Sequence, residues 1–411
     1  MKLLKEVKKY TLLSIVALLI ATVSSGQSKY DGRYGGYKFT DIAIAPSTPP
    51  IGQGLTGTCW CFSGIATMES ELKRMGKGEY DLSEMWIVRH AFIEKAKRMS
   101  MLRRNALKGS GSIGDVPYII EKYGIVPESA YPGLNYGTNF HVHWELNGVV
   151  NGYFKGVLQN KNGELSEGWI NGLNNILDAY LGEVPETFSY NGKEYTPQSF
   201  TQELGLNMDN YVRIASVMHV PFYKKFGLEV SGNWHWDDFY NLPLDEMIEV
   251  IDYAVRNGYS LTWIADVTNR GYSKEEGICV YPAESLEQIP PDERIEWLKY
   301  SDKEISDMGN REVPGAFAVP VAERIVTQES RQKEYLNFNV KEDHGMHIMG
   351  IAADQRGRIF YKIKNSAHHR AVYQNGGYYY ASQPYMKMFT ISLQLHKNGI
   401  PPHIAQKLKI E

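Results

Sequence analysis

The sequence predicts an α+β fold in two lobes, with helices in its front part and strands at its end. A helix is predicted from Cys59 onward, because apolar residues recur there three and four positions apart. About the last hundred residues read instead as short strands separated by turns. Helices followed by strands, rather than a regular alternation of the two, favour an α+β arrangement.

The composition is that of a folded globular protein. The chain has 411 residues, of which 43% are hydrophobic and 22% charged, enough apolar material for a sizeable core. The net charge is only −3 at pH 7. We therefore expect no nucleic-acid partner and no electrostatic attachment to an anionic membrane.

The first 26 residues have the pattern of a secretory signal peptide. Basic residues at the start precede an uncharged apolar run, Thr11–Val23, and small residues follow up to Gly26. This run of 13 residues is shorter than the roughly 20 that span a bilayer, although an uncleaved anchor is the alternative. We expect cleavage near Gly26, export to the periplasm, the cell surface or the medium, and no stable membrane insertion.

The first predicted helix follows a loop rich in proline and glycine, residues 45–54. It is expected to begin near Cys59, with Thr56 and Thr58 as candidate N-caps. Its charged residues fall between the apolar ones, which predicts one buried face and one solvated face.

Further helices are predicted downstream. One covers residues 81–99, with Ser83 as its candidate cap, and the next covers residues 115–123. The stretch from about 140 to 315 is mixed and includes a helical segment at 244–258.

Four strands are predicted near the end of the chain. Residues 347–353 and 358–365 read as a hairpin around a turn at 354–357. Further strands are expected at 376–382 and 388–396.

The chain contains three cysteines, Cys59, Cys61 and Cys279. An odd number leaves at least one thiol free, and Cys59 and Cys61 are too close on one helix to bridge each other easily. Cys59 lies where a glycine-containing loop enters a helix, and a helix N-terminus favours the reactive thiolate. The alternative is a buried cysteine in the first helical turn.

The stretch QGLTGTCWCFS, residues 53–63, resembles the active-site segment of papain-like cysteine peptidases. The resemblance implies that Cys59 is the nucleophile and that Gln53, six residues earlier, belongs to the oxyanion hole. Trp60 also matches the family, and Cys61 falls at a variable position of the core. Thr56 departs from the pattern, since secreted members usually have a disulfide cysteine there.

Two segments resemble the family's histidine and asparagine motifs, EDHGMHIMG with His344 and YKIKNS with Asn365. An independent geometric argument supports the pair, because the midpoint between them lies within the predicted turn at 354–357. An antiparallel hairpin would therefore bring His344 and Asn365 together at its open end. His347 is the alternative base, but three residues along a strand it would point to the opposite face.

One departure concerns the residue two positions after Asn365. The family usually has tryptophan there, covering the bond between asparagine and histidine, whereas this chain has Ala367. One of the tyrosines at 378–380 is a candidate for that cover. His368 and His369 are expected at the surface.

The pair His141 and His143 could in principle ligate a metal. No third ligand with clear spacing accompanies it, so we expect a solvated strand and no metal site.

The spacing of the motifs indicates a branch of the family. Cys59 and His344 are 285 residues apart (344 − 59), whereas ordinary papain-like enzymes need about 130–150. The spacing resembles the bleomycin hydrolase or aminopeptidase C branch, and the resemblance covers roughly residues 37–408. Three further segments are similar to that branch: residues 120–132, 195–211 and 395–408.

This resemblance implies one peptidase domain over residues 27–411 with a large insertion. We expect a helical lobe at about 50–140, the insertion at about 140–315 and a β-rich lobe at about 316–411. Ser110 and Gly111 would bind substrate backbone beside the nucleophile, together with Trp60.

The predicted function is peptide-bond hydrolysis through Cys59, His344, Asn365 and Gln53, on a peptide or protein substrate and without a cofactor. Members of the branch are aminopeptidases because their own chain end lies in the cleft, and this sequence stops at Glu411, earlier than theirs. The resemblance implies aminopeptidase action as the first expectation, with the cleft blocked by the insertion in place of the chain end. The alternative is an open cleft, with endopeptidase or less strict exopeptidase action. A catalytically weak peptide-binding protein, an acyltransferase and a homo-oligomer are left open.

Overall fold

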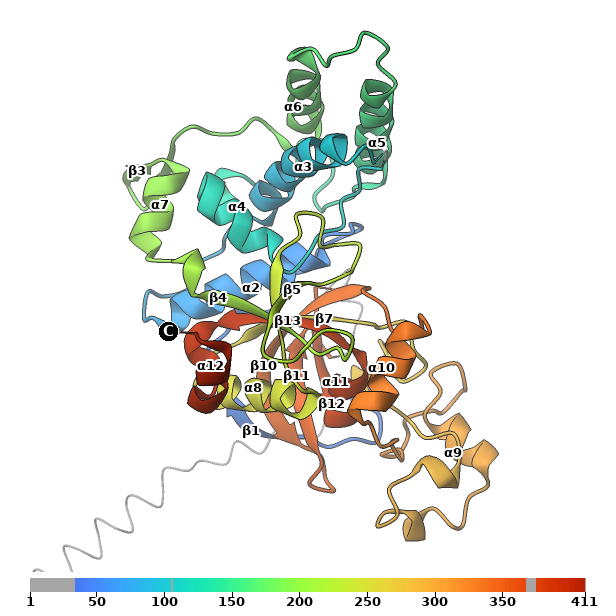
Figure 1. Ribbon diagram of the computed structural model, residues 1–411. Coiled ribbons are helices and arrows are strands. Elements are labelled where there is room, and N and C mark those ends of the chain that lie inside the picture. The colour runs from blue at the N-terminus through green and yellow to red at the C-terminus, as the bar shows by residue number, and fades with distance from the viewer. Residues whose placement is uncertain (1–33, 105, 367–374, 411) are drawn as a thin grey trace, which may run out of the picture. The chain divides into compact units, whose positions relative to one another are not determined.

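The computed structural model describes residues 34–104, 106–366 and 375–410 (Figure 1). These residues belong to one compact unit, Gly32–Glu411. The expected signal peptide lies outside the described residues, as do Ala367, His368 and His369. No helix in the described ranges is both long and apolar enough to cross a membrane.

The helical lobe is built around a core that the first helices share. The predicted helix at 115–123 is found with those bounds, and the helix after Ser83 begins where its hydroxyl accepts a hydrogen bond from the Trp86 N–H. A small hairpin, β2 (Phe188–Tyr190) with β3 (Lys193–Tyr195), packs on this lobe. The helices are α2 (Cys59–Arg74), α3 (Glu84–Met101), α4 (Asp115–Tyr123), α5 (Trp144–Leu158), α6 (Gly168–Leu181) and α7 (Pro197–Leu204).

The β-rich lobe is one large sheet, in the order β5-β6-β4-β13-β7-β10-β11-β12-β9-β8, with β1 paired to β10. Most neighbouring strands in it are antiparallel. The strands are β1 (Thr40–Ile44), β4 (Tyr211–Ala215), β5 (Lys225–Gly227), β6 (Asp238–Asn241), β7 (Leu261–Ala265), β8 (Tyr272–Ser273), β9 (Ile278–Cys279), β10 (His344–Ala353), β11 (Ile359–Lys364), β12 (Tyr378–Ser382) and β13 (Thr390–His396).

Several helices accompany this sheet. The last predicted strand starts later than expected, because Ser382 caps a short helix by accepting a hydrogen bond from the Tyr385 N–H and a proline occupies its first turn. The helices are α8 (Leu244–Arg256), α9 (Asp302–Met308), α10 (Gln328–Leu336), α11 (Gln383–Phe389) and α12 (Pro402–Leu408).

The stretch expected as a single insertion is divided between the two lobes. Its first part supplies α5, α6 and α7, whose apolar residues join the helical core. Its second part supplies β4 to β9, and β7 pairs directly with β10. Pairing between strands far apart in sequence is not encoded by local periodicity, so the sequence pattern could not reveal this division.

The predicted hairpin is present as β10 and β11. Its pairs run from Ala353 with Ile359 to His347 with Lys364, and the register shifts between Ile348 and Gly350. Strand β10 also extends to His344, which pairs with Ala265 of β7. Figure 1 shows α2 between the sheet and the helices α3 and α4, in agreement with its contacts to β7, β10, α3 and α4.

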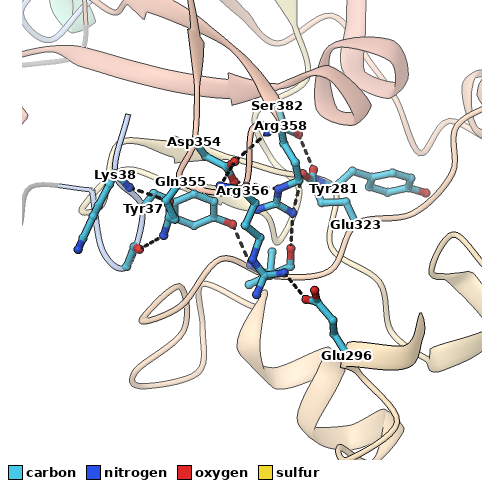
Figure 2. A network of polar contacts seen from close by, with 12 residues as sticks. Tyr37, Lys38, Tyr281, Glu296, Glu323, Asp354, Gln355, Arg356, Arg358 and Ser382 are labelled. Atoms are coloured by element: carbon cyan, nitrogen blue, oxygen red, sulfur yellow. Dashed lines mark hydrogen bonds and ion pairs between the residues drawn. The ribbon is translucent and has the colours of Figure 1, made fainter. Parts of the chain in front are cut away.

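A polar network fixes the closed end of this hairpin (Figure 2). Arg358 donates to the Asp354 carboxylate at 2.8 Å and to the Val321 carbonyl at 2.8 Å, and its guanidinium lies 3.9 Å from Glu323. Glu323 in turn accepts a hydrogen bond from the Tyr281 N–H at 2.8 Å. Both acids are buried, so Arg358 supplies the positive charge that they need.

Replacing Arg358 by methionine should destabilise the fold by about 3–5 kcal/mol, because two buried carboxylates lose their cation. The matched control is Arg356→Met. Arg356 lies two residues away and pairs at 3.2 Å with Glu296, whose side chain is 64% exposed, so its loss should cost about 1 kcal/mol or less. Urea unfolding followed by tryptophan fluorescence measures both values, and equal costs for the two variants would contradict the assigned role of Arg358.

Candidate active site

Cys59 begins helix α2, as the sequence predicts. Thr58, one of the two predicted candidates, is the N-cap residue, but it makes no side-chain cap bond and its hydroxyl pairs with that of Thr56. The Cys59 sulfur instead accepts hydrogen bonds from the backbone N–H groups of Trp60 and Gly345. These donors stabilise the sulfur in its charged form.

Cys59 and His344 lie in direct contact, the thiol of one hydrogen-bonded to the imidazole of the other. Burial alone would raise the pKa of the Cys59 thiol, but the imidazole and the two N–H donors outweigh it and lower that pKa. Burial likewise opposes a charge on His344, yet the adjacent sulfur and the bond to Asn365 raise the pKa of His344. Both shifts favour a thiolate paired with an imidazolium.

Asn365 fixes the other side of the imidazole. The His344 Nε2–H donates to Asn365 Oδ1 at 2.7 Å, which confirms that the hairpin brings these two residues together. The Asn365 amide donates in turn to the Tyr272 hydroxyl at 2.9 Å. These two bonds determine which atom of the amide faces the histidine.

Tyr272 is a site residue that sequence reasoning missed. It lies in β8, within the stretch expected as an insertion, and its ring stacks on Tyr379 with centroids 5.7 Å apart. Tyr379 is one of the tyrosines considered as aromatic cover near Asn365. No local signal marks Tyr272, because its contact with Asn365 joins residues far apart in the chain.

The side chain of Gln53 is held in a fixed orientation. Its Nε2 donates to the Thr56 carbonyl at 2.8 Å, and its Oε1 accepts from the Ser366 hydroxyl at 2.6 Å. The backbone N–H of Gln53 also donates to the Ser366 carbonyl at 2.8 Å. A primary amide has two N–H donors, so the second can meet an oxyanion.

The segment with His141 and His143 supports this loop rather than facing solvent. The Leu55 N–H donates to the His141 carbonyl at 2.7 Å, and the His143 N–H donates to the Leu55 carbonyl at 3.2 Å. A Cβ on Gly54, whose φ is +65°, would lie 2.3 Å from the His141 oxygen, so glycine is needed there. The predicted solvated strand is therefore wrong, because the close backbone approach buries His143 and leaves His141 partly buried, and burial lowers the pKa of each to about 4.

The predicted substrate segment lies against Trp60. The Trp60 Nε1–H donates to the Gly109 carbonyl at 3.0 Å, and a Cβ on Gly111 would lie 2.5 Å from the Trp60 ring. Ser110 is exposed and its carbonyl accepts a hydrogen bond from Lys95. Trp60 is only 2% exposed, so it supports the segment from below and is not open to a substrate.

The remaining candidates take no part in these hydrogen bonds. His347 is buried, pairs across the hairpin with Lys364, and has a pKa far below the usual range because of burial and that lysine. The Cys61 thiol donates to the Glu84 carbonyl at 3.3 Å, and burial raises its pKa well above the usual range. Cys279 is also buried and free. Within the described ranges, no three potential ligands are grouped to hold a metal ion.

Known proteins resemble this chain over most of its length. No protein-family profile matches it. Aminopeptidase C of Lactobacillus helveticus is 22% identical over 403 residues, covering 87% of this chain and 81% of the relative. Aminopeptidase C of Streptococcus thermophilus is 22% identical over 393 residues, covering 84% and 80%. The crystal structure of pepw from Lactobacillus rhamnosis aligns with a TM-score of 0.66 at 20% identity, covering 90% of this chain and 84% of that one.

The comparisons test two predictions made from the sequence, the fold and the branch that the chain resembles. The α+β fold of the papain-like kind is confirmed, and so is the resemblance to the aminopeptidase C branch. The chain therefore has the papain-like fold and is similar over most of its length to aminopeptidase C.

Proposed function

We propose that the chain hydrolyses peptide bonds by covalent catalysis at Cys59. The observation that carries the proposal is the continuous set of contacts from the Cys59 thiol through His344 to Asn365. A nucleophile in contact with a base, and a base oriented by a third group, is the arrangement that this chemistry requires.

The proposed reaction starts with the thiolate of Cys59 attacking the carbonyl carbon of the scissile bond. The negative charge that develops on the carbonyl oxygen is stabilised by the Gln53 amide and the Cys59 backbone N–H. His344 then donates its proton to the leaving amine, and the acyl group stays on the sulfur. In the second half His344 removes a proton from water, which attacks the acyl group and releases Cys59.

Asn365 contributes by holding the ring of His344 in this orientation during both proton transfers. Tyr272 acts on His344 only through Asn365, because its hydroxyl accepts a hydrogen bond from the Asn365 amide and so holds that amide in place. We assign Asn365 and Tyr272 as positioning residues, since neither touches the scissile bond in the proposed reaction.

We further propose that the enzyme is an exopeptidase acting at the amino end of peptides. Relatives named aminopeptidase C, similar over more than four fifths of this chain, support this choice. Endopeptidase action is the alternative, and an N-acetylated substrate distinguishes the two.

The catalytic assignment predicts different effects for neighbouring residues. Cys59→Ala should abolish cleavage of a fluorogenic peptide, whereas Cys61→Ala should keep most of it, because Cys61 is buried on the other face of α2. His344→Ala should lose at least about 10²–10⁴-fold in kcat/KM, and Asn365→Ala should lose less because the base survives. Near-normal activity in Cys59→Ala would refute the mechanism.

The paired pKa shifts predict an unusual pH profile for alkylation. The pKa of Cys59 is lowered, so iodoacetamide should label it rapidly at pH values where an ordinary thiol is still protonated, with the rate falling only as the pH drops through that lowered pKa. In His344→Ala the profile should shift to higher pH, because the imidazolium no longer favours the thiolate. Mass mapping of the labelled residue checks the site, and coincident profiles for wild type and variant would contradict the ion pair.

We also propose that the protein is exported with cleavage near Gly26, on the evidence of its basic and apolar leader pattern. N-terminal sequencing of the native protein should find a mature chain that starts near Gln27. Recovery of an intact Met1–Gly26 segment on a cytoplasmic protein would contradict the proposal.

A further inference from the structure

The connection between β5 and β6 is a strap that joins the two lobes. The hairpin closes with Gly227 opposite Asp238, and we call residues 228–237 between these strands the strap. Figure 1 shows this connection leaving the sheet on the side of α3 and α4. Within the strap, the Asn233 amide donates to the Leu228 and Asp237 carbonyls at 3.1 Å, which holds its two ends together.

The far part of the strap is anchored on the helical lobe. The Trp234 Nε1–H donates to Asp115 at 2.7 Å, and His235 pairs with the same carboxylate at 3.2 Å. The Trp234 ring is 6% exposed and belongs to the helical core, although the strands on either side of the strap, β5 and β6, belong to the sheet. Trp236 carries the Arg98 guanidinium 4.4 Å above its ring. The strap is therefore a packed element and not a loose loop.

Its first part is anchored on the β-rich lobe beside the predicted base. The Gly232 N–H donates to Glu342 at 2.7 Å, and Glu342 lies two residues before His344. A Cβ on Gly232 would lie 2.5 Å from the same carboxylate, so the backbone approaches it as closely as a glycine allows.

These anchors bring the strap to the side of the site where substrate backbone is expected to bind. A Cβ on Gly111 would lie 2.6 Å from Asp115, the residue that holds Trp234. The Lys95 ammonium lies 5.1 Å from the Trp60 ring and 5.8 Å from the Trp234 ring, so it packs between nucleophile helix and strap. The strap thus lies against the Ser110–Gly111 side of Cys59.

The charge at this end of the site is negative. Asp115 has Lys95 at 3.8 Å and His235 as partners. Lys95 also attracts Glu342, but within the described part of the chain it forms its ion pair with Asp115. Burial raises the pKa of Glu342 to about 7. A cation bound beside it would restore its charge, and the α-ammonium of a peptide is such a cation.

We propose that the strap closes this side of the site and that Glu342, which is hydrogen-bonded to Gly232 of the strap, receives the α-ammonium group of the substrate. The proposal rests on the proposed peptidase function and assigns to the strap and Glu342 the selection of peptides whose free amino terminus lies within one or two residues of the scissile bond. A longer chain would meet the strap, and an acylated amine would lose its charge pair with Glu342.

The experiment compares fluorogenic amides that differ only in a free or acetylated amino group, using the purified full-length protein. Wild type should prefer the free amine by at least about tenfold in kcat/KM. Glu342→Gln should raise KM for the free amine by about 10–100-fold with little change in kcat, the value expected for a lost hydrogen bond to a charged group. Glu229→Gln is the matched control, because Glu229 lies on the same strap but is exposed and faces His219.

A second pair of variants tests the barrier itself. Trp234→Ala should raise cleavage of the acetylated and of longer blocked substrates by about tenfold or more, whereas Trp234→Phe should keep the barrier because it fills most of the same space. The rate at which iodoacetamide labels Cys59 reports whether the reactive thiol is intact in each variant. Iodoacetamide is small, so we expect its labelling rate at Cys59 not to depend on whether the strap closes the site.

The outcomes separate this proposal from the function on which it rests. Cys59-dependent cleavage of free and acetylated substrates at equal rates would leave the peptidase function standing, but it would overturn both the exopeptidase assignment and the proposed role of the strap. Unchanged discrimination in Glu342→Gln and in Trp234→Ala, with Cys59 still reactive, would also overturn it. No cleavage of either substrate and slow labelling of Cys59 in wild type would refute the peptidase function, and this proposal with it.

Discussion

The close passage of β10 across α2 is the contact on which the site depends. The strand begins at His344 and the helix at Cys59, and Gly345 lies between their backbones. A Cβ on Gly345 would lie 2.8 Å from the Ser63 hydroxyl and 2.9 Å from the Cys59 carbonyl, so a larger residue would push the elements apart. The same glycine donates its N–H to the Cys59 sulfur. One residue thus lets the thiol meet the imidazole and supports the charged form of that thiol.

The end of β11 extends this dependence to the rest of the site. Asn365 follows that strand and orients the base, and the next residue, Ser366, holds both the backbone and the side chain of Gln53. The orienting amide and the predicted oxyanion donor therefore take their positions from one strand end. A one-residue slip in strand pairing would turn those side chains to the other face, so the register of β10 and β11 matters for both. Arg358 and its buried acids fix that register from the closed end.

Local patterns predicted the parts of the site that local sequence determines. The nucleophile helix was visible in its apolar spacing, and the meeting of His344 with Asn365 followed from the symmetry of a hairpin about its turn. The parts that were missed are contacts between distant segments. Tyr272 reaches Asn365 from a stretch expected to be an insertion, and His143 is buried because its backbone pairs with the loop after Gln53. The periodicity of apolar residues carries no information on such pairings, because each of the two segments shows its own helix or strand pattern whether or not the other lies beside it.

The two lobes also exchange side chains across the site. Trp234 comes from the sheet and packs in the helical core, while Ile113 precedes α4 and packs in the core of the sheet. Moving the lobes apart would expose both side chains to water, at roughly 1.5–3 kcal/mol for each large apolar residue. The position of Cys59 on one lobe relative to His344 on the other is therefore fixed by packing before a substrate arrives. A base and nucleophile held in this way need little rearrangement during reaction, which is where a pre-organised site gains its rate.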